Sequence, residues 1–203
     1  AASGGIYFPF VAAQTTRRYE LNETLVSKAV TTNSFDSYGN PDSVAVDPAD
    51  GSCWIGDWYN NEILHISSLG TIFWRSSEST ETSFYGPESV AVNANDHSVW
   101  VADNYNGQIV HLASDGTELW RSPAGYDPWW VDVDPVDGSC WVADWYYSRV
   151  LHFAANGTLL FNGTSFSGPI CLSVNPNDGS VWIVDDEWHQ LVHLSATGEE
   201  ISR

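Results

Sequence analysis

A segment built around a tryptophan recurs four times along the chain, and this repeat constrains the fold more than any other feature. In each copy the tryptophan stands in a short apolar run that ends in Asp, and a second apolar run containing a His follows. The four tryptophans are Trp54, Trp100, Trp141 and Trp182, spaced 46, 41 and 41 residues apart. A period of this size is typical of propeller blades or solenoid units.

Each repeat is predicted to form four short strands, here called a to d. In the copy that begins at Gly86-Pro87, the strands are expected at 89–92, 99–102, 109–113 and 117–121. Residues of the Asn, Asp, Pro and Gly type, which favour tight turns, separate strand a from strand b and strand c from strand d. Every repeat therefore predicts a meander of four antiparallel strands.

The strands read as nearly continuous apolar runs, such as Val-Trp-Val and Ile-Val-His-Leu, which indicates burial on both faces. Radial repetition of four-stranded sheets satisfies that requirement. We therefore expect an all-β chain folded as a β-propeller, with four full blades at 38–83, 84–125, 126–165 and 166–203. A β-solenoid is the structural rival, but its coils are shorter than this repeat.

Residues 1–37 do not fit the repeat and are predicted to be an arm or a degenerate blade of three strands, making about five blades in all. The alternative is that the apolar start of this segment adds to a sheet edge of a neighbouring subunit. The residues of this possible assembly strand are Ile6, Tyr7, Phe8, Phe10 and Val11. A polar insertion at 78–83 is expected to be a solvated loop.

The repeat Gly-Pro-x-Ser-Val-Ala-Val-Asp-Pro-x-Asp-Gly-Ser-x-Trp-Val-Ala-Asp, followed by a Val/Ile-x-His stretch and an Asp-Gly-Thr turn, resembles the NHL-type repeat of β-propellers. The resemblance covers about 40–203. It implies the propeller fold but not one function, since NHL propellers include lyases, hydrolases, signalling modules and scaffolds.

The chain carries 26 acidic residues against 7 Lys and Arg, a formal net charge of -19. Such a surface repels phosphate backbones and anionic lipid, so we expect no nucleic acid partner. No apolar run approaches the length that a membrane-spanning helix needs, so no membrane insertion is expected either. The acidic, aromatic-rich composition, and a start at Ala1 without any Met, favour a processed, extracellular protein. On that basis three sequons are possible N-glycosylation sites: Asn22, Asn156 and Asn162.

Two of the three cysteines, Cys53 and Cys140, stand where the other repeats carry Val99 and Val181. They are interpreted as buried thiols that pack like valine. A disulfide between Cys140 and Cys171 is the alternative, and it depends on their distance.

Two sets of polar residues repeat with the blade and are therefore expected to be structural. The histidines of strand c should bond neighbouring backbone or carboxylate groups, and the aspartates that end strand b should hold the b–c turn. A ring of calcium ions bound to these aspartates is the alternative. The sets are His65, His111, His152 and His193, and Asp57, Asp103, Asp144 and Asp185.

Two histidines lie outside the pattern. His97 replaces the Gly of an a–b turn and is expected to be exposed, and His189 with Asp185 is the weak candidate for a metal site. Gluconolactonase-type and lyase-type propellers, which the repeat resembles, hold a metal in the central channel on unlike residues, and no such set is evident here. Serine-hydrolase, zinc-protease and phosphate-loop motifs are also missing from the sequence, so no catalytic residue is predicted.

The aromatic residues give the more specific functional indication. In a four-stranded antiparallel blade the b–c and d–a connections emerge at the same end, so their aromatic side chains should gather on one face of the propeller. Some of these rings are expected to pack against one another, and the rest to contact sugars or protein. The predicted binding face consists of Trp58, Tyr59, Tyr105, Trp129, Trp145, Tyr146 and Trp188.

Three functions follow in order of preference. The first is an extracellular, non-catalytic structural or interaction propeller that assembles with copies of itself through the aromatic face or the N-terminal strand. The second is a carbohydrate-binding propeller with glycans as partners. The third is a metal-dependent lyase or hydrolase. No cofactor is expected other than calcium.

Overall fold

The computed structural model describes residues 41–79 and 83–203. These residues form four sheets of four antiparallel strands each, in which neighbouring strands follow one another in the chain. Blade 1 contains β1 (Pro41–Val46), β2 (Cys53–Asp57), β3 (Glu62–Ile66) and β4 (Ile72–Arg75). Blade 2 contains β5 (Pro87–Val92), β6 (Val99–Asp103), β7 (Gln108–Leu112) and β8 (Glu118–Arg121).

Blades 3 and 4 repeat the pattern. Blade 3 contains β9 (Pro128–Val133), β10 (Cys140–Asp144), β11 (Arg149–Phe153) and β12 (Leu159–Gly163). Blade 4 contains β13 (Pro169–Val174), β14 (Val181–Asp185), β15 (Gln190–Leu194) and β16 (Glu200–Ser202). The predicted all-β architecture of four full meanders is confirmed.

The register within each blade sets a tryptophan of strand b directly opposite the histidine of strand c. The two rings stack face to face, with centroids 4.1 to 4.2 Å apart in all four blades. The histidines are therefore structural, as predicted. Their main partner is this indole ring, which the sequence analysis did not identify, in addition to hydrogen-bonding groups.

The a–b turns are built alike in all four blades. An Asp or Asn begins each turn, and its side chain accepts a hydrogen bond from the backbone N–H two residues on. The turn ends on a residue with positive φ, which is Gly51 in blade 1 and His97 in blade 2. His97 thus takes the glycine position, and it is only partly exposed because its Nδ1 lies 2.6 Å from Asp47 Oδ2.

Apolar side chains join each blade to the next. We call the face that meets the following blade the leading face and the opposite one the trailing face. Between blades 2 and 3, Trp100 and Ile109 on a leading face pack against Val131, Val142 and Leu151 on a trailing face. Equivalent clusters join blade 1 to blade 2 and blade 3 to blade 4. The core of the molecule is thus a series of three inter-blade layers.

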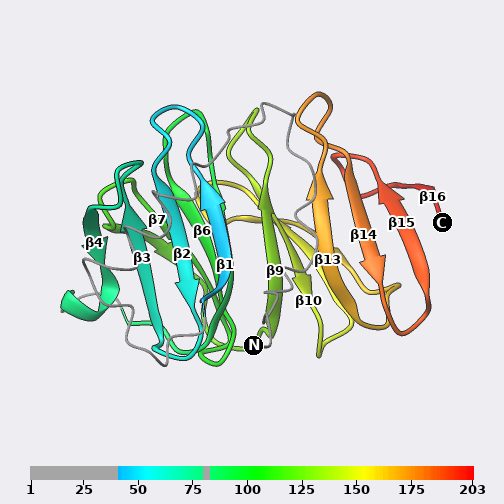
Figure 1. Cartoon of the computed structure of the whole chain (residues 1–203). Coiled ribbons are helices and arrows are strands. Elements are labelled where there is room, and N and C mark those ends of the chain that lie inside the picture. Colours follow the sequence, from blue (N-terminus) through cyan, green and yellow to red (C-terminus); the bar gives the residue numbers. More distant parts are fainter. Residues whose placement is uncertain (1–40, 80–82) are drawn as a thin grey trace, which may run out of the picture.

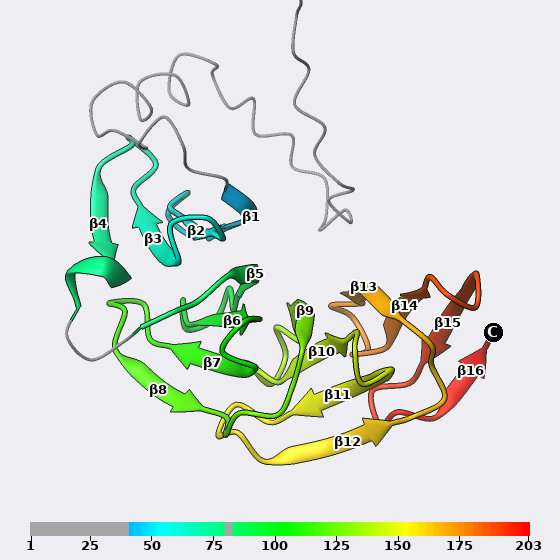
Figure 2. The same cartoon turned by 90° about the horizontal axis from the view of Figure 1, so that it is seen from below.

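The four blades fan out around an axis and leave a wide opening between blade 1 and blade 4 (Figures 1 and 2). The first strand of each blade lies on the inner side of the arc and the last strand on the outer rim. The described residues therefore form an open arc, which has two end faces that no described blade covers.

The segments outside the four blades are described only in part. Glu78, the first residue of the predicted polar loop at 78–83, is the last residue of a short 3-10 helix, Ser76–Glu78. The degenerate blade at 1–37, with the assembly strand from Ile6 to Val11, lies outside the described residues. No helix in the described part of the chain is long and apolar enough to span a membrane.

The three cysteines are free thiols, so the possible disulfide between Cys140 and Cys171 does not form. Cys140 is fully buried in the layer between blades 2 and 3, as its valine-like position predicts. Burial raises the pKa of its thiol well above the usual value, which keeps it neutral and unreactive.

Candidate binding face

The aspartates that end strand b fix the loops of the face on which the aromatic side chains gather. All four carboxyls are inaccessible to solvent. Asp103 Oδ1 accepts a hydrogen bond from the Tyr85 backbone N–H at 2.8 Å, and Asp144 Oδ1 accepts one from the Asp127 N–H at 2.9 Å. Asp185 Oδ1 accepts in the same way from Ser167 N–H at 3.0 Å.

These bonds correct the sequence interpretation in one respect. In blades 2 to 4 the carboxyl holds the d–a connection, which comes from earlier in the chain, and not only the following b–c turn. The predicted contact with the b–c turn is present in blades 1 and 2. Asp57 accepts from the backbone and side chain of Asn60, both at 3.0 Å, and Asp103 Oδ2 accepts from the Asn106 side chain at 3.0 Å. Sequence patterns report local turns better than bonds between distant segments.

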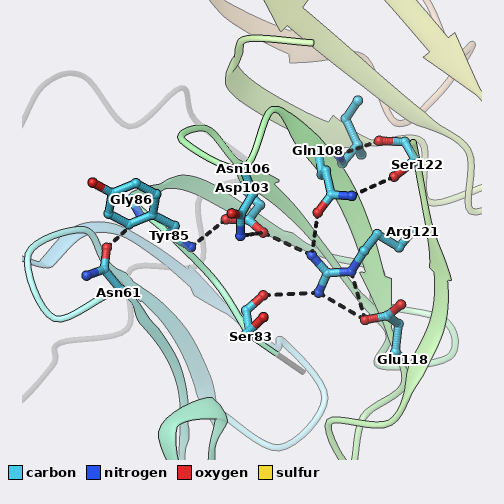
Figure 3. A network of polar contacts seen from close by, with 11 residues as sticks. Asn61, Ser83, Tyr85, Gly86, Asp103, Asn106, Gln108, Glu118, Arg121 and Ser122 are labelled. Atoms are coloured by element: carbon cyan, nitrogen blue, oxygen red, sulfur yellow. Dashed lines mark hydrogen bonds and ion pairs between the residues drawn. The ribbon is translucent and has the colours of Figure 1, made fainter. Parts of the chain in front are cut away.

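Arginines on the following strands complete two of the anchors. Arg121 donates to Asp103 Oδ2 at 3.0 Å and to Gln108, Glu118 and the Ser83 carbonyl (Figure 3). Arg149 Nε donates to Asp144 Oδ2 at 2.6 Å. Burial raises the pKa of the two carboxyls, and the arginines partly offset this effect. The anchors are therefore structural ion pairs that position the loops.

The aromatic rings on these loops form pairs. Trp129 and Trp145 have centroids 5.2 Å apart, and the rings are tilted by 56°. Tyr105 contacts Trp58 at 5.4 Å and Tyr85 at 5.0 Å, in both cases edge to face. Such geometry is favourable for aromatic pairs. The prediction that part of the rings pack against each other therefore describes these residues well.

Most of these rings nevertheless remain accessible. Trp58, Tyr126 and Trp145 are partly buried. The other large aromatic residues at this end of the blades expose between about a third and about two thirds of their surface: Tyr59, Tyr85, Tyr105, Trp129, Tyr146, Tyr147 and Trp188. The b–c connections leave the lower edge of the arc in Figure 1, where the arrows of β2 and β14 point. We call these exposed rings, together with their ring partners Trp58 and Trp145, the aromatic face.

Carboxyl groups lie beside the aromatic face on the inner strands. Glu88 is the second residue of β5, and Asp42 occupies the same position of β1. Burial, with the nearby charges of Asp42 and Asp127, raises the pKa of Glu88 to about 7, although the adjacent Trp58 side chain lowers it in part. A carboxyl that is partly protonated at neutral pH can both donate and accept hydrogen bonds, which suits a ligand rich in hydroxyl groups.

The structure does not bring the weak metal candidates into a metal-binding group. Among residues 41–79 and 83–203, no set of three or more His, Cys, Asp and Glu side chains is arranged to hold an ion. His189 stands at the tip of a b–c turn with a φ of 53°, and its backbone N–H donates to the Asp186 carbonyl. Asp185 is buried and holds Ser167 instead.

A serine–histidine contact occurs in two blades and does not form a catalytic site. His152 Nε2 lies 2.7 Å from Ser139 Oγ, and His65 Nε2 lies 3.0 Å from Ser52 Oγ. All four residues are buried, and the pair repeats with the blade. Because a nucleophile must reach its substrate, we assign these pairs to the support of the a–b turn.

Two of the three possible glycosylation sites can be placed. Asn156 lies exposed in the c–d turn of blade 3, where its side chain accepts from the Thr158 N–H at 3.0 Å, and Asn162 lies exposed on β12. Both are accessible, but their modification remains a prediction. Asn22 lies outside the described residues.

Comparison with known families decides the assignment of the repeat. Residues 84–112, which comprise most of blade 2, match the family model for the NHL repeat. The chain carries an NHL repeat. No curated protein sequence matches it.

The solved structures similar to this NHL-repeat chain are propellers that share less than 20% sequence identity with it. Hydrazine synthase from Kuenenia stuttgartiensis superposes with a TM-score of 0.66 at 13% identity, over 85% of this chain and 51% of that one. The inactive H270A virginiamycin B lyase from Staphylococcus aureus gives 0.64 at 16% identity, over 79% and 54%. A streptogramin B lyase gives 0.61 at 18% identity, over 76% and 51%.

This level of identity shows the propeller fold alone. The NHL-repeat chain spans about half the length of each of these three structures. The described blades form the open arc seen in Figure 2.

Proposed function

We propose that the chain is a non-catalytic, extracellular interaction propeller that assembles with copies of itself and uses the aromatic face as a contact surface. The observation that carries the proposal is the exposure of seven Trp and Tyr rings at one end of the blades, on loops held by buried carboxyls. Half of roughly 200 Å² per ring gives on the order of 700 Å² of accessible aromatic surface. A monomeric protein seldom exposes a contiguous patch larger than this, so the face is well suited to a partner.

Rigidity supports the same proposal. The loops that bear Tyr85 and Trp145 are tied to Asp103 and Asp144 by hydrogen bonds of 2.8 and 2.9 Å and by a neighbouring backbone contact. Preorganised aromatic side chains lose little conformational entropy on binding, which is why Trp and Tyr dominate interface energetics. The N-terminal strand from Ile6 to Val11 is retained as a second contact in the proposal.

The test is the size of the assembly formed by the full chain. Light scattering and electron microscopy should show particles much larger than the 22.4 kDa chain. The double variant Trp129→Ala/Trp145→Ala should reduce them, whereas Leu119→Ala, which removes an exposed apolar side chain on the outer strand β8, should not. A monodisperse monomer would contradict self-assembly.

Carbohydrate binding is the second candidate, and the carboxyls beside the rings favour it. Trp129 and Trp145 could stack on a sugar ring, while Glu88, Asp42 and Asp127 would contact hydroxyl groups. Binding to a glycan array that is lost in Trp145→Ala and kept in Leu119→Ala would support this function. If both variants bind as the wild type does, the aromatic face is not a glycan site.

A metal-dependent lyase or hydrolase is the third candidate, and the propeller folds of the two lyase structures support it only at the level of architecture. Calorimetric titration of the chain with Ca²⁺ would test it. Saturable binding that is reduced in Glu88→Gln would favour an acidic metal site near the axis. Heat of dilution alone would count against calcium.

A further inference from the structure

The two end faces of the arc expose side chains whose equivalents in the other described blades are buried. On the leading face of blade 4, Trp182 is 41% exposed, although its equivalent in blade 3, Trp141, is fully buried. Leu191 and Val184 on the same face are exposed as well. On the trailing face of blade 1, Val44 is 51% exposed, whereas the equivalent Val90 in blade 2 is 6% exposed.

The chain itself shows what covers such faces. In each of its three inter-blade layers, a leading face with a strand b tryptophan packs against a trailing face rich in valine and leucine. The arc has one uncovered face of each kind. By the pattern of the three internal layers, the leading face of blade 4 is therefore complementary to the trailing face of blade 1.

Polar contacts between blades have counterparts at the ends. Trp100 Nε1 donates to the Gly138 carbonyl at 3.3 Å, and by register this pair corresponds to Trp182 and Gly51. Asp132 Oδ2 accepts from the Val174 backbone N–H at 2.8 Å. At the ends of the arc, Ser173 takes the position of Asp132 and Val46 that of Val174, and the Ser173 hydroxyl oxygen can accept the same bond.

A histidine contact follows the same rule. His111 Nδ1 lies 3.1 Å from the Ala155 carbonyl of the next blade, and the corresponding pair at the ends is His193 and Ser68. Donors and acceptors are thus present on both end faces at the positions used inside the arc.

A second copy of the chain is the occupant that fits both end faces. The opening between blade 1 and blade 4 in Figure 2 is wide, and the described blades leave one end face of each kind uncovered. A second arc carries both complementary faces, so one copy can cover both end faces of the other at once. Related by a two-fold axis, two arcs of four blades give eight, within the usual range for propellers.

We propose that two copies of this chain close head to tail into an eight-bladed ring, with the leading face of blade 4 of each copy against the trailing face of blade 1 of the other. The ring goes beyond the proposed function and shares with it only the idea that the partner is a second copy. The surface is different, because the end faces lie at the edges of the arc and not on the aromatic face.

Two sequence differences should make the contact between blade 4 and blade 1 of the ring weaker than the three internal inter-blade layers. The position that is Gly56, Ala102 or Ala143 in blades 1 to 3 is the larger Val184 in blade 4. Opposite the strand c histidine, blades 1 to 3 carry an aromatic residue on strand d, whereas blade 4 carries Ser202. In addition, each copy carries a net charge of -19. The ring should therefore dissociate at low ionic strength and form as salt screens the repulsion.

Charge substitutions on the two faces provide the test. A Cβ atom at Gly56 would lie 3.7 Å from Val90 Cγ1, so the equivalent residues Val184 and Val44 should face each other across the ring contact. Val184→Glu and Val44→Lys would each place an unpaired charge in that contact. Mixed together, the two variants can form one contact with a Glu–Lys pair and one with wild-type residues.

Sedimentation velocity of the full chain should give a species of twice the 22.4 kDa mass, or multiples of it, that becomes more populated as salt rises. Each single variant should shift to the monomer, with at least tenfold weaker self-association, and an equimolar mixture should restore the dimer. Leu119→Glu, an exposed apolar position of similar accessibility in blade 2, should leave the dimer unchanged.

The outcomes separate the two proposals. Dimers that persist in both single variants, or a mixture that stays monomeric, would overturn the ring closure. Larger particles that depend on Trp129 and Trp145 but not on Val44 or Val184 would support the proposed function while overturning the ring. A discrete dimer that depends on Val44 and Val184 but not on the aromatic residues would support the ring and contradict assembly through the aromatic face.

A wild-type chain that stays monomeric at high salt and concentration would overturn the ring, and glycan binding would then still test the aromatic face.

Discussion

Blades 3 and 4 have the same sequence pattern around their tryptophan and differ in what surrounds it. Trp141 and Trp182 both stack on their own histidine at 4.1 Å. Yet Trp141 is enclosed by blade 4, whereas Trp182 is open to solvent. The comparison shows that the repeat determines the internal structure of a blade, while burial depends on whether another blade follows it.

Removal of the tryptophan should give the largest difference between the two blades. Trp141→Ala should lower the free energy of unfolding by about 3–5 kcal/mol, because it leaves a cavity in a closed layer. Trp182→Ala should cost only about 1–2 kcal/mol in the monomer, since it mainly loses the contact with His193. Urea unfolding at low salt and low protein concentration measures both. Equal losses would show that blade 4 is covered in solution.

Loss of the strand b carboxyl should also lower the free energy of unfolding more in blade 3 than in blade 4. Asp144→Ala removes the acceptor of two hydrogen bonds and leaves Arg149 largely buried without its partner, so we expect a loss of about 3 kcal/mol. Asp185→Ala removes one backbone bond, from Ser167, and should cost about 1–2 kcal/mol. Thermal unfolding of the two variants tests the order. A larger loss for Asp185→Ala would contradict the anchor described here.

A glycine substitution tests how closely the covered layers are packed. A Cβ at Gly157 would overlap the Trp120 ring of the preceding blade, and φ is 82°, so Gly157→Ala should cost about 3 kcal/mol through overlap and backbone strain. At Gly51, in blade 1, φ is 74° but the nearest atom is Ser68 Cβ at 3.3 Å. Gly51→Ala should cost about 1 kcal/mol. If the two variants unfold alike, strain and not packing sets the cost.

The covered face of blade 3 should also make stability depend on pH. Burial lowers the pKa of His152 from 6.5 to about 4. The unfolded chain then binds a proton more readily than the native one, so this contribution is fully present above pH 6.5 and is lost as the pH falls toward 4. The loss should be about 3 kcal/mol. His152→Phe should flatten the stability profile between pH 7 and 4.5. An unchanged slope would contradict a buried neutral His152.

Glu88 gives the smallest and opposite effect. Its pKa is raised to about 7 from 4.5, so its favourable contribution is present below pH 4.5 and is lost as the pH rises through 7. Because the carboxyl is partly solvated, the change should be only about 1 kcal/mol. Glu88→Gln should be more stable than the wild type at pH 8 and equal to it at pH 5 in chemical denaturation. A variant that is less stable at pH 8 would show that the ionised carboxyl is needed.

Local sequence was sufficient for the parts of the structure that repeat. The four meanders, the a–b turns and the position of His97 in place of a glycine were predicted from turn residues and apolar runs, because these depend on neighbours in the chain. Burial of both faces, predicted for every full blade, is wrong for blades 1 and 4, each of which exposes one face. In blade 4, β14 alternates between buried and exposed residues because no described blade lies beyond it.

The candidate site was predicted in outline but not in its details. Aromatic residues on the b–c and d–a loops were expected on one face, and the structure shows how they pair. The raised pKa of Glu88 was missed, because it arises from burial and from Asp42 and Asp127, which lie far from Glu88 in sequence. The acidic residue at one position of strand a in two successive repeats was the only available signal.

By itself, the sequence determined the blade: its four strands, its turns, and the repeated positions of the tryptophan in strand b and the histidine in strand c. These features follow from side-chain alternation, turn propensity and a fixed repeat length, all of which act over a few residues. Only the tertiary structure decided that the blades form an open arc, that the strand b carboxyls hold distant loops, and that Trp182 and Val44 are exposed. Those properties depend on how one blade packs against the next and on where the series of blades ends.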